Sequence, residues 1–396
     1  MLQQFKKNKK IGIDAIVFAA YLVTSPLHQI LVLGNGATIT KYLALAAMIA
    51  CFKYGGVRTL NHELLSKIKP MILWFGLSII WSSSRSTTIS SLSSIVSYFA
   101  LMIIVGSKEW NEKEKTLFRI SMIIATVYCS YLLLGSVRTM RRATIIGENG
   151  LEADQNILAA NIGYGIIFAM NYLLKARNKL YRIAIIVCGV MVLGGIISTG
   201  SRGALIAVGS ALLYYIISSG NINLKIKRKI VFVTIGLIIV LYIMLFTGIL
   251  GNKSVIGRYT GETETTSGRT EVWTDYALLL IHRPIGIILG YGYGAEKGAY
   301  GKYYYTNWPP ATHNDYLFFI TSVGIIGLYF VFCFIQFVWR QSQNNEDILG
   351  RAVVVLMLVA SLSVNIFTRY GWWNAIIFAY IGIGKEENNE IVGETT

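Results

Sequence analysis

The sequence predicts an all-α membrane protein with about twelve transmembrane helices and one large extracytoplasmic loop. The 396 residues are 54% hydrophobic and only 14% charged, whereas a soluble domain carries about 25% charged residues. Apolar runs recur along the chain at the length of about 20 residues that a helix needs to cross a bilayer. One long polar segment, residues 251–314, interrupts these runs.

The predicted spans follow one another with short connections. The apolar run after the basic residues 1–10 has no small-residue cleavage site, so it is expected to be the first span rather than a signal peptide. The third and twelfth spans are short, which is expected of spans that are tilted less or are partly buried in the bundle. The twelve spans lie near residues 11–33, 37–53, 70–83, 88–106, 117–135, 157–175, 182–199, 203–219, 230–250, 315–338, 351–368 and 371–384.

These spans predict one integrated membrane domain. Residues 1–250 hold the first nine helices, residues 251–314 form an extracytoplasmic catalytic loop, and residues 315–396 hold the last three helices and a tail. The segments before the first span and after the second, fourth, sixth and eighth spans are rich in lysine. Because basic loops stay in the cytoplasm, both termini are expected there and the long loop is expected outside. The net charge of +16 lies in short membrane loops, which argues against a nucleic-acid ligand.

The outer side carries arginine where the orientation rule predicts few cations. A guanidinium group binds phosphate bidentately, whereas the lysine ammonium is a point charge. For any single arginine, pairing with an outer acid is the simpler explanation, but the set favours a phosphate or pyrophosphate ligand. The arginines expected outside are Arg85, Arg138, Arg141, Arg142, Arg202, Arg258, Arg269, Arg283 and Arg369.

Two of these arginines are expected at helix starts. The turn 198–203 between the seventh and eighth spans is so short that Arg202 must lie at the outer membrane edge, where the eighth span begins. A helix inside the outer loop should begin at Arg269 and end before Pro284. A helix N-terminus presents free N–H groups and its positive dipole end to an anion. Arg202 and Arg269 are therefore candidates to clamp one pyrophosphate, with Arg258 as a weaker third.

Aromatic residues crowd the second half of the loop. The glycine-rich segment 290–294 is interpreted as a turn, because no βαβ unit surrounds it. Aromatic rings suit stacking on the C–H faces of sugars, and they suit an interfacial aromatic belt equally well. The sequence leaves both interpretations open. The candidate glycan contacts are Tyr291, Tyr293, Tyr303, Tyr304 and Trp308.

His313 is the strongest candidate for a catalytic residue. It follows the rigid pair 309–310 of prolines and comes two residues before Asp315, where the loop returns to the membrane at the tenth span. Imidazole can accept a proton near neutral pH. A lone histidine is more often structural, but this position favours a general base. No further metal ligands stand at useful spacing, so no metal site is predicted.

Together these motifs resemble the O-antigen ligase and O-antigen polymerase superfamily of polysaccharide-assembly glycosyltransferases, which have the GT-C type of fold. The resemblance rests on Arg202 in its Ser-Arg-Gly turn, on Arg269 at a helix start, and on His313 followed by Gly324. It covers most of the chain in span count and loop position, and its specific motifs lie within residues 199–327.

The resemblance implies an inverting, metal-independent glycosyltransferase in the bacterial cytoplasmic (inner) membrane, with its active site facing outward. The donor would be an oligosaccharide linked to a polyprenyl pyrophosphate such as undecaprenyl pyrophosphate. The arginines would hold the pyrophosphate, and His313 would activate an acceptor hydroxyl. The resemblance implies no cofactor, and the partners would be a glycan acceptor, the lipid bilayer and other polysaccharide-assembly proteins.

Three functions remain open on the sequence. A polysaccharide polymerase of the O-antigen or capsule type is the favoured expectation. The second is a ligase that attaches the glycan to a lipid, wall or protein acceptor, although Ile206 stands where ligases of this family tend to have leucine. The third is a lipid-linked oligosaccharide flippase or other transporter. Transporters tend to show repeated halves and ionisable residues at mid-membrane, and neither is clear here.

Overall fold

The computed structural model describes residues 10–33, 37–57, 59–136, 138–139, 142–147, 150–220, 224–225, 228 and 268–384. The predicted ninth span and the first part of the outer loop, including Arg258, lie outside the described residues. The described part is helical, as predicted, with one exception. Two strands, β1 (Arg138–Thr139) and β2 (Arg142–Ala143), form an antiparallel pair between two helices.

A helix coincides with every predicted span that falls within the described residues. Three further helices lie where the outer loop was expected. In chain order the helices are α1 (Ile13–Thr24), the short 3-10 helix η2 (Ser25–Leu27), α2 (Ile39–Lys53), α3 (His62–Leu77), α4 (Arg85–Gly106), α5 (Glu112–Gly135), α6 (Gln155–Lys175), α7 (Lys179–Ser198), α8 (Arg202–Ser218), α10 (Arg269–His282), α11 (Ile285–Leu289), α12 (Glu296–Tyr304), α13 (Asp315–Asn344), α14 (Ile348–Ala360) and α15 (Tyr370–Ile381).

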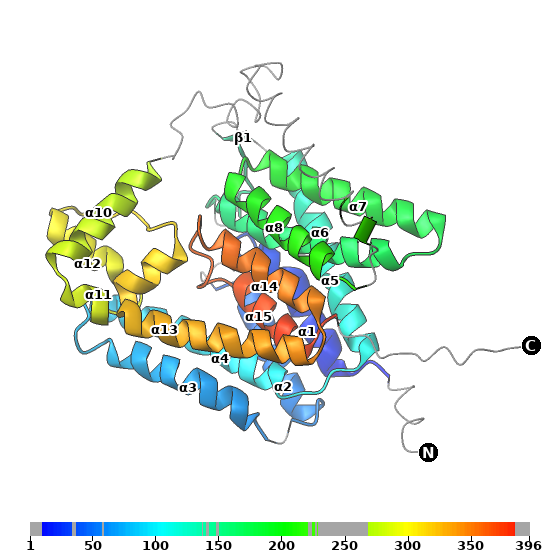
Figure 1. Cartoon of the computed structure of the whole chain (residues 1–396), viewed down its shortest axis with the longest axis horizontal. Coiled ribbons are helices and arrows are strands. Elements are labelled where there is room, and N and C mark those ends of the chain that lie inside the picture. The colour runs from blue at the N-terminus through cyan, green and yellow to red at the C-terminus, as the bar shows by residue number, and fades with distance from the viewer. Residues whose placement is uncertain are drawn as a thin grey trace, which may run out of the picture.

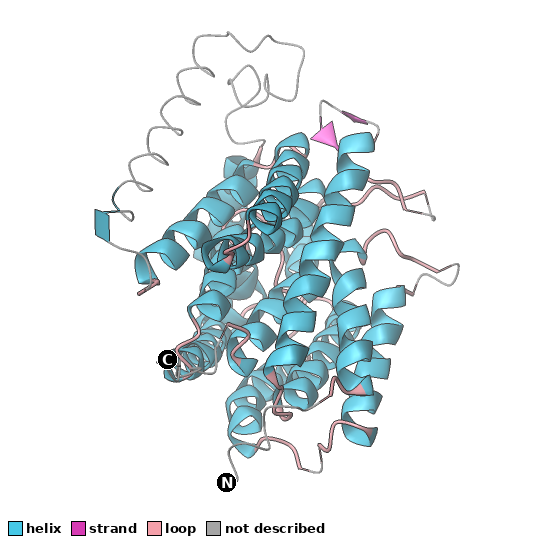
Figure 2. Ribbon diagram, turned by 90° about the vertical axis from the view of Figure 1, so that its right-hand side faces the viewer, coloured by secondary structure: helices cyan, strands magenta, loops and turns pink. Residues whose placement is uncertain are grey.

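Five of the described helices are long and apolar enough to cross a membrane: α4, α5, α6, α7 and α13. Shorter apolar helices occupy Ile13–Leu27, α8 and α14. The longest of these helices, α13, contains 30 residues and has a non-helical backbone at Gly324. The helices are consistent with a multi-pass membrane protein (Figure 2), and the total of twelve spans stays a prediction.

Two predicted boundaries are wrong for identifiable reasons. The third helix begins at His62 rather than near residue 70, because the Asn61 side chain accepts a hydrogen bond from the backbone N–H of Leu64, 3.0 Å away, and caps the helix there. Pro70 then lies inside the helix. The eleventh span ends at Ala360, and residues 361–369 form a loop instead of a further helical turn.

The helix α15 occupies the centre of the bundle, which is one of the two arrangements that its shortness left open. Every residue from Gly371 to Tyr380 is buried, and the fully buried ring of Trp373 stacks against Tyr98 and lies edge-on to Phe99 of α4. A helix that is apolar on all sides is stable only when surrounded by protein or lipid. Figure 1 shows α14 and α15 enclosed between α13 on one side and α1, α6 and α8 on the other.

The connections gather at two opposite ends of the bundle. At one end, Lys108 contacts Asp14 and Glu114, which joins the start of α1 to the connection between α4 and α5. Gly384, after α15, donates its N–H to Asp347 before α14, over 3.0 Å. At the other end, α10, α11 and α12 gather around the start of α13 (Figure 1). This arrangement matches the alternation predicted from the lysines, and the orientation in the membrane stays a prediction.

Candidate active site

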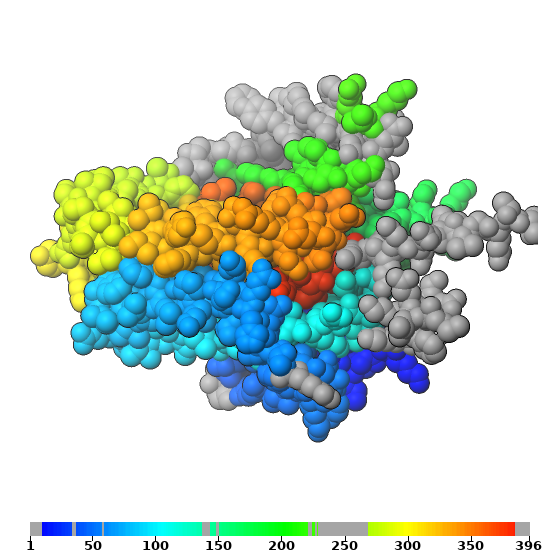
Figure 3. Space-filling view, turned by 60° about the horizontal axis from the view of Figure 1, so that its bottom comes forward, coloured from blue at the N-terminus to red at the C-terminus, as the bar shows by residue number. Residues whose placement is uncertain are grey.

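The described part of the outer segment folds into a small aromatic layer. The helices α10 and α12 pack through Tyr276, Leu279 and Tyr300, which are buried. Asp275 joins them, because its carboxylate accepts a hydrogen bond of 2.6 Å from the Tyr300 hydroxyl. Figure 3 shows this layer as a compact mass at the end of α13, next to α3. The tyrosines of the segment thus build a folded unit rather than an open loop.

A break in α13 provides the docking surface for this layer. Gly324 has φ +70° inside the helix, a left-handed conformation that glycine adopts readily. A β-carbon at this position would lie 2.0 Å from the carbonyl oxygen of Ile288 in α11. Glycine is therefore required both by the backbone conformation and by the close approach of the two helices.

The break frees backbone carbonyl groups that an unbroken helix would use internally. The carbonyl oxygens of Thr321 and Ser322 accept hydrogen bonds of 2.8 and 2.9 Å from the N–H groups of Tyr291 and Gly292. The glycine-rich segment 290–294 is thus a turn, as predicted, and it anchors the layer to α13. This pairing explains why a glycine stands eleven positions after His313 in the motif.

Asp315, the first residue of α13, organises the loop 361–369. Its Oδ2 atom accepts hydrogen bonds from the Ser361 hydroxyl at 2.8 Å and from the N–H groups of Ile366 and Phe367 at 3.0 and 2.9 Å. The side chain is 2% exposed. Because these backbone N–H groups bond to Asp315, residues 361–369 do not continue the helix α14, which ends at Ala360.

The residue before His313 is held from two sides. The carbonyl oxygen of Thr312 accepts a 2.7 Å hydrogen bond from the indole N–H of Trp273 in α10. Its hydroxyl accepts one of 2.8 Å from the amide of Asn365, in the loop 361–369. His313 therefore lies between the outer layer and this loop.

His313 combines an unusual backbone with a polar, half-buried position. Its φ of +46° is in the left-handed region, which non-glycine residues seldom adopt. Burial, followed by the nearby positive charge of Arg269, lowers the pKa of the imidazole. Asp154, the N-cap of α6, opposes this shift, and Lys297 of α12 adds to the lowering. The net effect keeps the imidazole neutral at pH 7, with a lone pair able to accept a proton.

Arg202 begins α8, as the turn 198–203 predicted. A β-carbon on the next residue, Gly203, would lie 2.0 Å from the hydroxyl oxygen of Ser363. The absence of a side chain at Gly203 therefore lets the first turn of α8 abut the loop 361–369, the same loop that contacts Asp315 and Thr312.

Arg269 begins α10, also as predicted, and His282 ends the helix before Pro284. Arg269 stands four residues before Trp273, and side chains at this spacing lie on the same face of a helix. The indole N–H of Trp273, on that face, donates the hydrogen bond to Thr312. Three distant parts of the chain, at Arg202, Arg269 and His313, thus converge around the loop 361–369 and the start of α13.

The candidate glycan contacts fall in different environments. Trp308 is 90% exposed, and Tyr291, Tyr303 and Tyr304 are half-buried. Tyr293 is fully buried and stacks on Phe75 at a ring distance of 4.5 Å. Its ring has no exposed face for a sugar, so the expectation of a contact there does not fit its position.

The hydroxyl groups of two half-buried tyrosines are hydrogen-bonded within the layer. The Tyr303 hydroxyl lies 2.6 Å from Nδ1 of His282, and the Tyr304 hydroxyl donates to the carbonyl oxygen of Asp275 over 2.9 Å. Each ring packs within the layer and keeps one edge open. Of the candidate aromatic residues, Trp308 offers the largest open surface.

Sequence reasoning missed the polar residues that assemble the site. Ser361, Ser363 and Asn365 interrupt the apolar pattern of the predicted eleventh span, and this interruption is the signal that could have identified the loop. Asp154 also belongs to this group, since its Oδ1 atom caps α6 and accepts a hydrogen bond of 2.8 Å from the N–H group of Asn156.

One family model matches the chain, and its description is O-antigen ligase. The match covers residues 184–332, which include Arg202, Arg269, His313 and Gly324. No curated protein matches the chain. Residues 184–332 are thus similar to the O-antigen ligase family, and this match supports the superfamily of O-antigen ligases and polymerases for this membrane protein.

Proposed function

We propose that the protein is a membrane glycosyltransferase that moves a glycan from a polyprenyl pyrophosphate to an acceptor hydroxyl on the outer side of the membrane. The observation that carries this proposal is the convergence of Arg202, Arg269 and His313 around one loop. The match to the O-antigen ligase family spans all three residues. A polysaccharide polymerase is the first candidate.

The arginines act on the leaving group. Each lies at a helix start, where the helix dipole and the guanidinium group both favour an anion. In the transition state the bond between the anomeric carbon and the pyrophosphate oxygen breaks, and negative charge grows on that oxygen. Fixed donors aimed at developing charge are commonly the largest single contribution to catalysis.

His313 acts on the nucleophile. The neutral imidazole takes the proton of the acceptor hydroxyl while the oxygen attacks the anomeric carbon on the face opposite the pyrophosphate. One carbon–oxygen bond forms as the other breaks, so the configuration inverts, and the proton remains on His313. Polyprenyl pyrophosphate leaves with the electron pair.

The charges around His313 couple donor binding to base strength. In the free protein, the cation Arg269 lowers the pKa of the imidazole. A bound pyrophosphate neutralises that cation and adds negative charge nearby, and both changes raise the pKa. The histidine therefore becomes a stronger base once the donor is in place.

A ligase is the second candidate, and the description of the matched family favours it. The sequence departure at Ile206 does not decide the question. That side chain is 63% exposed on α8. Polymerase and ligase share the donor chemistry and differ in the acceptor.

The test is to replace each arginine by lysine, which keeps the charge and removes the bidentate fork. Purified protein in liposomes receives a lipid-linked oligosaccharide, and product length is read on a gel. Loss of a charged hydrogen bond of about 1.5–3 kcal/mol corresponds to a roughly 10- to 100-fold fall in rate for Arg202→Lys and Arg269→Lys.

Arg283→Lys is the matched control. Arg283 is exposed beyond the other end of α10, 5.5 Å from the centre of the Tyr303 ring, and its replacement should leave the rate nearly unchanged. Normal product from both Arg202→Lys and Arg269→Lys would disprove the pyrophosphate clamp. Longer polymer indicates a polymerase, and single transfer to a separate acceptor indicates a ligase.

A further inference from the structure

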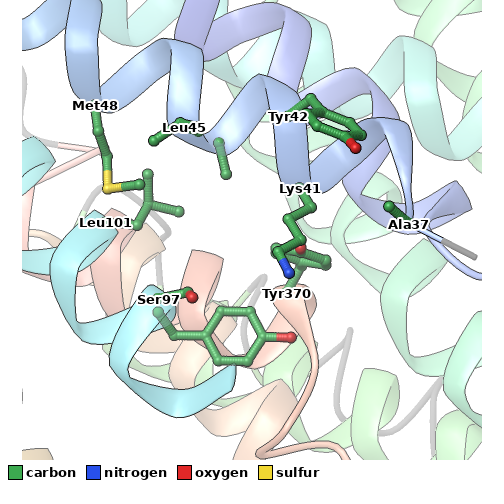
Figure 4. A pocket seen from close by; sticks show the side chains of 10 residues that line it. Ala37, Lys41, Tyr42, Leu45, Met48, Ser97, Leu101 and Tyr370 are labelled. Carbon is green, nitrogen blue, oxygen red and sulfur yellow. The ribbon is translucent and has the colours of Figure 1, made fainter. Parts of the chain in front are cut away.

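A pocket of about 280 Å³ opens between α2 and α4, away from the proposed active site. Figure 4 shows Lys41 and Tyr370 at one side of this pocket and Met48 and Leu101 at the other. None of the residues that line it belongs to the loop 361–369, to α10 or to the start of α8. The pocket is therefore a separate feature with one polar end and one apolar end.

The polar end of the pocket carries the positive charge of Lys41. The Lys41 ammonium group has no acidic partner within ion-pair distance among the described residues. Lys41 is in the first turn of α2, after the N-cap Thr38. A cation is disfavoured at this end of a helix. An anion bound in the pocket would satisfy both the ammonium group and the helix end.

The apolar end opens towards the hydrocarbon of the proposed bilayer. Tyr42, Leu45 and Ile49 follow one another along one side of α2, and they are 49%, 51% and 57% exposed. An exposed apolar stripe of this kind on a membrane protein faces lipid. Leu45 and Met48 line the pocket itself, and the flexible methionine side chain can adapt to a chain of variable shape.

We propose that this pocket binds one acyl chain of an anionic phospholipid, whose phosphate group pairs with Lys41. A single lysine suits one phosphodiester charge, whereas a pyrophosphate is better held by the arginine forks proposed for the donor. Among the residues that the structure describes, no acidic side chain lines the pocket to receive an ammonium headgroup. Phosphatidylglycerol is therefore preferred over phosphatidylethanolamine.

The bound lipid would steady the start of α15. The Tyr98 hydroxyl, on the pocket wall, donates to the carbonyl oxygen of Thr368 over 3.1 Å. The Tyr98 ring also meets Tyr370 edge-on at 5.0 Å. These contacts join the pocket to the residues on either side of Arg369, the N-cap of the buried helix α15.

The experiment measures thermal unfolding of the delipidated full-length protein after addition of each phospholipid. Phosphatidylglycerol should raise the unfolding temperature of the wild type by roughly 2–5 °C, because a ligand that binds only the folded state stabilises it. Phosphatidylethanolamine should raise it less. Lys41→Gln should abolish the difference between the two lipids.

Lys53→Gln is the matched control, since Lys53 is exposed at the opposite end of the same helix, and it should keep the full difference. A second variant, Leu45→Trp, fills the pocket from a half-exposed position and should also remove the effect of phosphatidylglycerol. Equal stabilisation by both lipids, or an undiminished effect in Lys41→Gln, would overturn the proposal. Displacement of phosphatidylglycerol by polyprenyl phosphate at an equal concentration would assign the pocket to a substrate lipid instead.

Discussion

His313 is held in a conformation that costs free energy. A left-handed backbone costs a non-glycine residue about 1–2 kcal/mol, and its φ is +46°. Hydrogen bonds on both sides hold His313 in this conformation. Before it, Thr312 bonds to Trp273 and Asn365, and after it, Asp315 bonds to the loop 361–369. Such strain gathers at functional sites, where the surrounding structure imposes it.

Replacing His313 tests its role as the base. Because a positioned base contributes about 10²–10⁴-fold to rate, His313→Ala should lower transfer by that factor while donor binding persists. His313→Gln should fall equally far, since an amide cannot take the proton. The measurement is polymer formed per minute by purified variants at matched concentration.

His282→Gln serves as the control for this pair. His282 lies in the same outer layer, and its Nδ1 atom is 2.6 Å from the Tyr303 hydroxyl. Its replacement should leave the rate within about two-fold, because it is an exposed residue outside the proposed catalytic site. Near-normal product from His313→Gln would mean that the histidine only orients the acceptor.

The acidic side of the pH–rate profile follows from the lowered pKa of His313. A general base works in its neutral form, so the rate falls as pH drops through its pKa. Because burial and Arg269 lower that pKa in the free enzyme, the fall in kcat/KM should lie below the usual value of about 6.5. A midpoint at or above pH 7 for kcat/KM would contradict the assignment.

At the scale of elements, the broken helix α13 is the joint between the membrane bundle and the outer layer. Gly324→Ala should destabilise the protein, because the new β-carbon meets the Ile288 carbonyl oxygen and the backbone is left-handed. The backbone term alone is about 1–2 kcal/mol. The result is a lower unfolding temperature and faster proteolysis within α10–α12.

Gly209→Ala is the matched control, since Gly209 is exposed in the middle of α8 and no atom lies within 4 Å of a β-carbon built there. Alanine is the better helix former, so this variant should be as stable as the wild type or slightly more so. An unchanged unfolding temperature for Gly324→Ala would show that the joint accommodates a β-carbon and that glycine is not required at this position.

At the scale of the whole molecule, the orientation in the membrane is the main prediction. We expect Lys297→Cys, at an exposed position on α12, to react with an impermeant thiol reagent in whole cells. Lys53→Cys, at the opposite end of the bundle, should react only after the membrane is broken. The reverse result would place the site in the cytoplasm and reject the proposed donor side.

Local patterns account for much of the fold. A helix coincides with each apolar run within the described residues. The tight turn located the start of α8 and the proline located the end of α10, because helix boundaries depend on neighbouring residues. The predicted boundary at residue 368 failed, since a distant carboxylate, Asp315, takes the backbone N–H groups of Ile366 and Phe367. The periodicity of apolar residues cannot predict a contact between residues that lie 51 or 52 positions apart in the chain.

The sequence by itself determined the class of the protein, the positions of Arg202, Arg269 and His313 at the ends of helices, and the resemblance that the family match supports. Only the tertiary structure decided that these ends meet around the loop 361–369, and that Tyr293 belongs to the core rather than to the surface. The reason is physical. Helix formation depends on contacts within a few residues, whereas the site depends on contacts between residues that are far apart in the chain.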